Sequence, residues 1–108
     1  MIVHVVLFQP RAGLSDEQRD RVLADLRQAA TEIPTIRRFR IGRRVLHGLP
    51  GYEQAMTDNY EYAALIEFDD REGLEAYLRH PAHAAAGAHF TAAASRAVAY
   101  DYEVSELK

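Results

Sequence analysis

The N-terminal stretch IVHVVLFQ (residues 2–9) decides the fold. It is rich in β-branched residues and is followed by Pro10, which is typical of a strand. Successive side chains of a strand point to opposite faces, so the even-numbered positions share one face and the odd-numbered positions the other. Both faces are apolar except for His4, so both need cover. Helices of the same chain can cover one face, and a second subunit is the simplest cover for the other.

Residues 16–32, further along the chain, follow the pattern of an amphipathic helix. Apolar side chains recur there at helical spacing. Ser15 and Gln18 form a capping box at the start. We expect the helix to end before Pro34, because the residue preceding a proline avoids the α region.

The second half of the chain predicts three strands and two helices. We expect strands over residues 36–46, 60–68 and 98–104, a helix capped by Asp69 or Asp70 that ends at Pro81, and an alanine-rich helix over 81–96. A glycine- and proline-containing loop spans 47–59. Two right-handed crossovers in this order give an α+β, ferredoxin-like βαββαβ fold with a four-stranded antiparallel sheet. Two such sheets, stacked on their bare faces, make a dimeric α/β barrel.

Size and composition narrow the class of protein. The 108 residues fit one domain, residues 1–108. The net charge of -3 lacks the basic excess of a nucleic-acid binder. No cysteine is present, which excludes disulfides and thiolate metal sites. No apolar run approaches the ~20 residues of a membrane span, and the N-terminal run is too short for a signal sequence. We expect a cytoplasmic protein with no nucleic-acid or membrane partner.

Three arginines share one face of the strand expected at 36–46: Arg38, Arg40 and Arg44. Such a stripe can attract an anionic ligand. A charged, solvated strand face that resists edge-to-edge pairing is the simpler interpretation.

The stretch YLRHPAH (residues 77–83) places a phenol and two imidazoles at the joint between the last two helices. Tyr77 and His83 are six residues apart, so one straight helix would not bring them together, whereas a break at Pro81 can turn His83 back toward Tyr77. A zinc site is the rival interpretation of His80 and His83. Because Pro81 lies between them and no third ligand is evident, we expect no metal. We expect His80 to cap or close the joint.

Four stretches together resemble the Dabb family, the dimeric stress-responsive A/B barrel proteins. They are MIVHVVLF (1–8), Ile33-Pro34 with the spacing to Gly42, YAALIEF (62–68) and, above all, YLRHPAH (77–83). The likeness extends from Met1 to about Val104. It implies the ferredoxin-like fold and the homodimer already expected from the strand at 2–9.

The best understood relative in this family is the plant olivetolic acid cyclase, which closes a linear tetraketide thioester by aldol condensation. By resemblance, its catalytic histidine and tyrosine fall on His83 and Tyr77, a pocket histidine on His4 and an aspartate of the last strand on Asp101. A further pocket histidine falls on Tyr62, where this sequence departs, and the bulky residues of the last helix are largely alanines here. The resemblance implies a substrate pocket, which we expect to be lined by His4, Val6, Phe8, Tyr62, Ala64 and Gly87.

The chemistry of an aldol closure suits these residue types. Neutral imidazole, with a pKa near ~6.5, makes His83 a candidate general base, and a protonated phenol makes Tyr77 a candidate oxyanion donor. Asp101 would fix the tautomer of His83 if it reaches that ring. Each residue keeps a structural alternative: His83 at the surface, Tyr77 in the core, His4 as a hydrogen-bonded core histidine, and Asp101 as an ordinary strand residue.

Three functions therefore stay open at this point. The first is a cofactor-free polyketide cyclase. The second is a non-catalytic, stress-responsive dimer that binds a ligand. The third is a cofactor-free monooxygenase on the same barrel. All three predict a second copy of the chain and a small hydrophobic or aromatic ligand as partners, with no cofactor.

Overall fold

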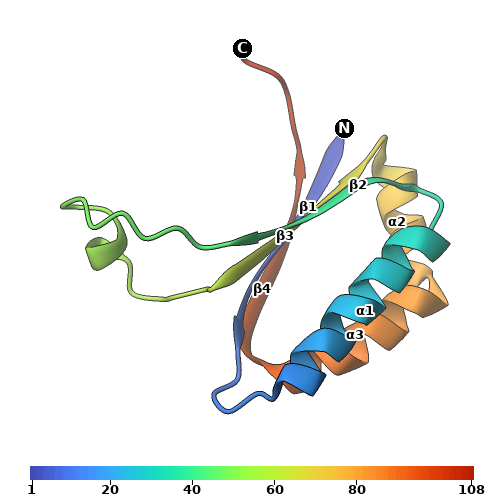
Figure 1. The fold of residues 1–108 in the computed structure, drawn as a ribbon. Coiled ribbons are helices and arrows are strands. Elements are labelled where there is room, and N and C mark those ends of the chain that lie inside the picture. Colours follow the sequence, from blue (N-terminus) through green and yellow to red (C-terminus); the bar gives the residue numbers. More distant parts are fainter.

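The computed structural model describes residues 1–108 and contains a four-stranded antiparallel sheet with helices on one face (Figure 1). The elements in chain order are β1 (Ile2–Pro10), α1 (Asp16–Glu32), β2 (Ile36–Arg43), the 3-10 helix η1 (Glu53–Ala55), β3 (Tyr62–Phe68), α2 (Arg71–Arg79), α3 (Pro81–Ala93) and β4 (Ala94–Glu103). The strand order is β2-β3-β1-β4, with β1 antiparallel to both of its neighbours. The ferredoxin-like fold expected from the sequence is confirmed.

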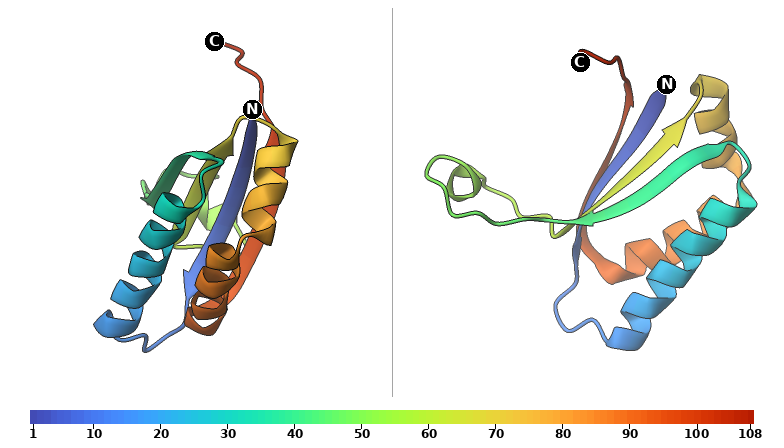
Figure 2. Two further views of the ribbon diagram at one scale, coloured as in Figure 1. Left: turned by 90° about the vertical axis from the view of Figure 1, so that its right-hand side faces the viewer. Right: turned by 45° about the horizontal axis from the view of Figure 1, so that its top comes forward.

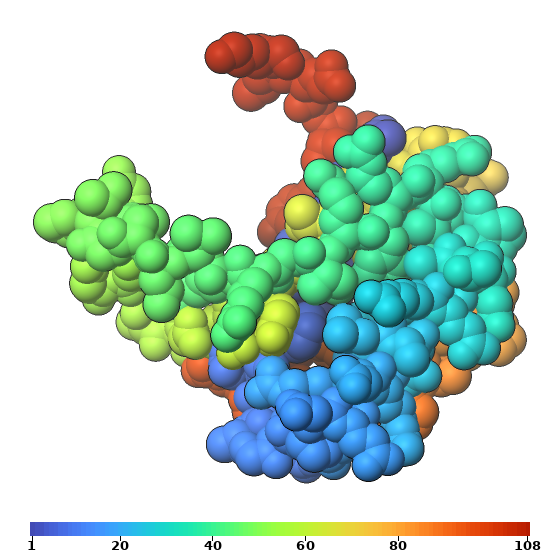
Figure 3. Space-filling model, viewed as in Figure 1, coloured from blue at the N-terminus to red at the C-terminus, as the bar shows by residue number.

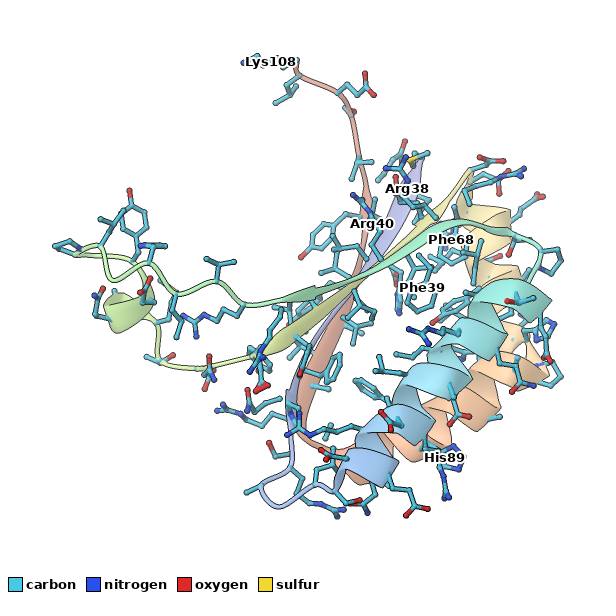
Figure 4. All side chains as sticks on the ribbon, viewed as in Figure 1. Arg38, Phe39, Arg40, Phe68, His89 and Lys108 are labelled. Atoms are coloured by element: carbon cyan, nitrogen blue, oxygen red, sulfur yellow. The ribbon has the colours of Figure 1, made fainter.

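The helices cover the face of the sheet that carries the even-numbered side chains of β1. Figure 2 shows α1 and α3 side by side over this face, with α2 beyond them. The core between the two layers consists of Ala29, Ile33, Ile66, Phe68, Leu74 and Tyr77. Phe39 of β2 packs against this core, while the neighbouring Arg38 and Arg40 point to the opposite, open face (Figure 4).

Short polar contacts set the ends of the helices. The Gln18 backbone N–H donates to Ser15 Oγ at 3.1 Å, so the expected capping box is confirmed and α1 has the expected bounds. Asp70 caps α2 by accepting from the Gly73 N–H at 2.8 Å. His80 Nδ1 accepts from the Ala82 N–H at 3.0 Å, and Pro81 occupies the first turn of α3. His80 therefore has the structural role expected of it.

Four element boundaries differ from the sequence-based expectation. The last strand begins at Ala94 instead of residue 98, and α3 ends correspondingly early at Ala93. Pairing with β1 outweighs the helix propensity of this alanine-rich stretch, because Arg96 lies opposite Gln9 in the sheet. β2 ends at Arg43 instead of 46, and β3 begins at Tyr62 instead of 60.

The open face of the sheet combines apolar side chains with a small charged network. Val5 lies between Leu65 of β3 and Tyr100 of β4, which is more than half exposed. On the β2 side, Arg40 Nη2 donates to Glu67 Oε2 at 3.2 Å, and Arg38 Nε lies 3.6 Å from the same oxygen. Arg38 and Arg40 of the arginine stripe are thus paired within the chain, whereas Arg44 lies beyond the end of β2 and hydrogen-bonds Asn59. None of the helices has the length and hydropathy to cross a bilayer.

Candidate functional site

A cavity of about 300 Å³ lies between the sheet and the helices. Of the residues expected to bind substrate, five line it: His4, Val6, Phe8, Ala64 and Gly87. Tyr77 and His83 line it as well. Its other walls are mostly apolar, so polar chemistry is confined to His4, Tyr77 and His83.

Tyr62 lies outside this cavity. Its ring stacks on Phe8 with 5.3 Å between centroids, and it lines a second apolar cavity of about 220 Å³ beside α1. The two cavities share Phe8, Leu26 and Phe90 in their walls. Tyr62, which departs from the family pattern, therefore lines the second cavity and not the cavity that contains His4, Tyr77 and His83.

His4 is buried, with 6% of its surface exposed, and it is held by Asp101. The two residues are directly opposite in the β1–β4 pair, and His4 Nδ1 lies 2.6 Å from Asp101 Oδ1. A carboxylate only accepts hydrogen bonds, so Nδ1 carries the proton that it donates. This fixes the orientation of the imidazole and leaves Nε2 as its free nitrogen.

Tyr77 stands between two imidazoles. Its ring centroid lies 5.5 Å from that of His4 and 4.6 Å from that of His83, and the ring also packs on Phe68 at 5.2 Å. Burial and the nearby negative charge of Asp101 raise the pKa of Tyr77 to about 12. The phenol is therefore protonated at neutral pH and is a hydrogen-bond donor.

His83 reaches the site from the first turn of α3. The break at Pro81 changes the direction of the chain after α2, and the His83 backbone N–H donates to the His80 carbonyl at 3.0 Å. Burial and positive charge on His4 lower the pKa of His83, and a hydrogen bond with the Leu78 backbone partly opposes them. The imidazole is therefore neutral at pH 7, the form that accepts a proton.

Asp101 contacts a different histidine from the one considered in the sequence. It pairs with His4, because the antiparallel register of β1 and β4 places those two positions opposite each other. His83 is on a helix on the other side of Tyr77. The resulting order across the site is Asp101, His4, Tyr77, His83.

The other histidines lie at the surface or in the helix joint. His47 pairs with Glu53, and His89, on the outer side of α3 (Figure 4), pairs with Asp25. No group of three histidine, cysteine, aspartate or glutamate side chains is arranged to hold a metal ion.

Sequence reasoning missed several apolar wall residues, and the two that also line the second cavity are Leu26 and Phe90. Phe90 is the one bulky apolar side chain of the alanine-rich helix, seven residues after His83. Two helical turns separate these positions, so they share a face. This spacing in the sequence could have identified Phe90 as a wall residue of the cavity. The rings of Phe90 and Phe8 meet edge to face at 4.8 Å and divide the two cavities.

A family model and a related plant protein both match this sequence. The sequence matches the family described as "Stress responsive A/B Barrel Domain" (Dabb) over residues 2–104. It is 26% identical over 94 residues to the stress-response A/B barrel domain-containing protein At5g22580 of Arabidopsis thaliana, covering 86% of this chain and 79% of that protein. The resemblance noted in the sequence is therefore confirmed.

Solved structures agree on the fold. A dimeric ferredoxin-like protein of unknown function from Jannaschia sp. superposes with a TM-score of 0.75 and 28% identity, covering 95% of this chain and 98% of that one. A hydroxynitrile lyase from Passiflora edulis superposes with a TM-score of 0.80 and 19% identity, covering 99% and 95%. At that identity, the likeness to the lyase concerns the fold alone.

Proposed function

The chain belongs to the stress responsive A/B barrel (Dabb) domain family, and from that premise we propose that it is a homodimer that binds a small hydrophobic or polyketide-like molecule. We further propose that it acts on a carbonyl of this molecule by general acid–base chemistry, as a cofactor-free cyclase. His83 is the base and Tyr77 the oxyanion donor. Asp101 and His4 position the donor.

Two features of the chain support the homodimer. The odd-numbered side chains of β1 and the exposed Tyr100 and Tyr102 leave the β1–β4 part of the second sheet face apolar and open. A structural relative at 28% identity is itself described as dimeric. Stacking two open faces would bury this surface in both copies.

One observation carries the enzymatic part of the proposal. The protonated Tyr77 ring lies between the neutral His83 and the Asp101-bound His4, at the polar end of an otherwise apolar cavity. A concave apolar pocket with a few convergent polar groups and shifted pKa values is typical of a small-molecule site.

The proposed reaction balances without an added oxidant or reductant. A ring nitrogen of His83 removes a proton from a carbon between two carbonyl groups, and the electron pair moves onto one carbonyl oxygen. The Tyr77 hydroxyl donates a hydrogen bond to that oxyanion. The enolate carbon then bonds to a second carbonyl carbon of the same molecule, whose oxygen takes the proton from the His83 imidazolium.

A non-catalytic binding function is the second candidate, and the pKa of His83 is the observation that favours it. The lowered pKa keeps the ring neutral but also makes it a weaker base. A pocket with the same walls can hold a hydrophobic ligand without turning it over. The homodimer and the cavity are common to both candidates.

Turnover of a panel of β-keto thioesters, with ligand binding followed in parallel, separates the two candidates. We expect His83→Ala and Tyr77→Phe each to abolish most of the cyclisation while the dimer and ligand binding persist. His89→Ala and Tyr52→Phe, which change surface residues of the same types, are the matched controls. Turnover that both site variants leave unchanged would contradict the catalytic assignment, and binding without turnover by the wild type would favour the second candidate.

A further inference from the structure

The chain between β2 and β3, residues 44–61, projects from the body as an arm. Figure 1 shows it extending from the sheet on the side away from the helices, with the tip at η1. The C-terminal segment after Glu103 also stands away from the body. In the space-filling view the two segments border an open hollow (Figure 3).

The protein exposes more surface than its mass requires. Its accessible surface is 7611 Å², whereas a compact monomer of 12.2 kDa is expected to expose roughly 6,100 Å². The radius of gyration is 14.9 Å, against about 13 Å for a compact chain of this length. The excess of about 1,500 Å² is more than the roughly 800 Å² that each partner buries in a standard interface.

Much of the exposed surface on the arm is apolar. Val45 is 80% exposed and Leu46 is 68% exposed, and three further large apolar side chains of the arm are more than half exposed: Leu49, Tyr52 and Met56. The arm also meets the open sheet face, because Met56 lines one pocket with Leu7 of β1 and Ala63 of β3. On the same face Tyr100 and Tyr102 are more than half exposed. Several large apolar side chains exposed on one segment are typical of a contact surface.

The tip of the arm has a defined structure of its own. His47 Nε2 lies 3.1 Å from Glu53 Oε2, and its Nδ1 accepts from the Leu49 N–H at 3.1 Å. The His47 ring also meets the Tyr52 ring edge to face at 5.4 Å. These contacts hold the tip together even though its apolar side chains face outward.

The root of the arm is tied to β4. Arg96 donates to Asp58 Oδ1 and to the Asn59 carbonyl, both at 2.9 Å, and its guanidinium lies 5.4 Å from the centroid of the Tyr60 ring. Arg44 also hydrogen-bonds Asn59 across the root. The direction of the arm is therefore set before any partner binds, which lowers the entropic cost of association.

We propose that this arm is a dimerisation clamp whose occupant is a second copy of the chain. This proposal rests on the homodimer proposed above. In that dimer, the arm of each copy would contact its partner beside the partner's open sheet face. A second copy fits because the exposed apolar side chains of the arm meet the open sheet face, where Met56 shares a pocket with Leu7 and Ala63. A two-fold axis uses that surface twice, and the excess exposed area is enough for the share that each partner buries in a stable dimer.

The test compares the strength of the dimer in the full-length chain with and without charges on the arm. We expect the double variant Leu46→Asp/Leu49→Asp to weaken dimerisation by about ten-fold or more in sedimentation equilibrium, with an unchanged circular dichroism spectrum. The matched control, Ala84→Asp/Ala88→Asp, adds the same charges to exposed positions of α3 and is expected to dimerise like the wild type. A dimer as strong in the arm variant as in the control would overturn the clamp.

A labelling experiment reports on the arm directly. The chain has no cysteine, so Leu49→Cys introduces a single thiol. We expect this thiol to react more slowly as the protein concentration is raised from the monomer to the dimer range. A thiol that reacts at the same rate in an established dimer would overturn the clamp alone, whereas a wild-type chain that stays monomeric would overturn the homodimer as well.

Discussion

His4 and Asp101 face each other across β1 and β4, and Asp101 Oδ1 lies 2.6 Å from His4 Nδ1. The histidine is buried while the aspartate side chain remains 39% exposed on the edge strand. The negative charge of Asp101, at the edge of the sheet, is therefore in contact with the buried His4, whose ring packs against Tyr77. The charge of Asp101 adds to the effect of burial in raising the pKa of Tyr77.

Replacing Asp101 by asparagine removes the charge but keeps an oxygen that accepts from His4. Because the charge of Asp101 contributes to the raised pKa of Tyr77, we expect that pKa to fall in Asp101→Asn while burial still keeps it above 10. The measurement is an alkaline titration of phenolate absorbance, with the Tyr77→Phe difference isolating this residue. Glu103→Gln, on the same strand, is the control and is expected to leave the titration unchanged.

Asp101→Ala tests the structural side of the same contact. It leaves the buried His4 Nδ1–H without a partner, and we expect a loss of about 1–3 kcal/mol in the free energy of unfolding. Urea denaturation measures it, with Asp101→Asn as the matched variant that retains the hydrogen bond. Equal stability of the alanine and asparagine variants would show that the contact contributes little to folding.

The Tyr77 ring and its hydroxyl have separable roles. Tyr77→Phe keeps the packing against His4, His83 and Phe68, so we expect it to change the unfolding free energy by less than about 1 kcal/mol. Tyr77→Ala empties a core position and is expected to cost about 3–5 kcal/mol. Thermal and urea unfolding of the two variants check this. A phenylalanine variant as unstable as the alanine variant would mean that the hydroxyl itself holds the core together.

The pKa of His83 predicts how stability depends on pH. A lowered native pKa means that the native state binds fewer protons than the unfolded chain, so the stabilising contribution is complete above the unfolded value of about 6.5 and is lost as the pH falls through the native pKa. We expect the urea midpoint of the wild type to fall more between about pH 7.5 and about pH 5 than that of His83→Ala. Parallel pH profiles for the two proteins would contradict the lowered pKa.

Local sequence patterns were sufficient to predict those features that depend on residues close together in the chain. The Ser15 cap, the break at Pro81 and the return of His83 toward Tyr77 all follow from spacing within one or two helical turns. The pairing of His4 with Asp101 joins positions 97 residues apart and depends on the register of two strands. That register shifts between Gln9 and Pro10, where β4 begins earlier than its composition predicts. One residue of slip would turn a side chain to the other face, so neither partner could be assigned from its own surroundings.

Two substitutions at Gly87 test stability and ligand binding separately. It lies inside α3, lines the cavity, and has open space where a Cβ would be. We expect Gly87→Ala to raise the free energy of unfolding by about 0.4–1 kcal/mol, because alanine restricts the unfolded chain without strain in the helix. The larger Gly87→Leu is expected to fill part of the cavity and to weaken binding of aromatic ligands.

Gly73 in α2 is the matched control for the alanine substitution. A Cβ there would lie 3.4 Å from both Asp70 Oδ1, which caps the helix, and Thr35 Cβ, so close packing offsets the gain from the helix. We therefore expect Gly73→Ala to be no more stable than the wild type in urea denaturation. If Gly87→Leu binds the same ligands as the wild type in a thermal-shift series, the cavity beside His83 is not where they bind.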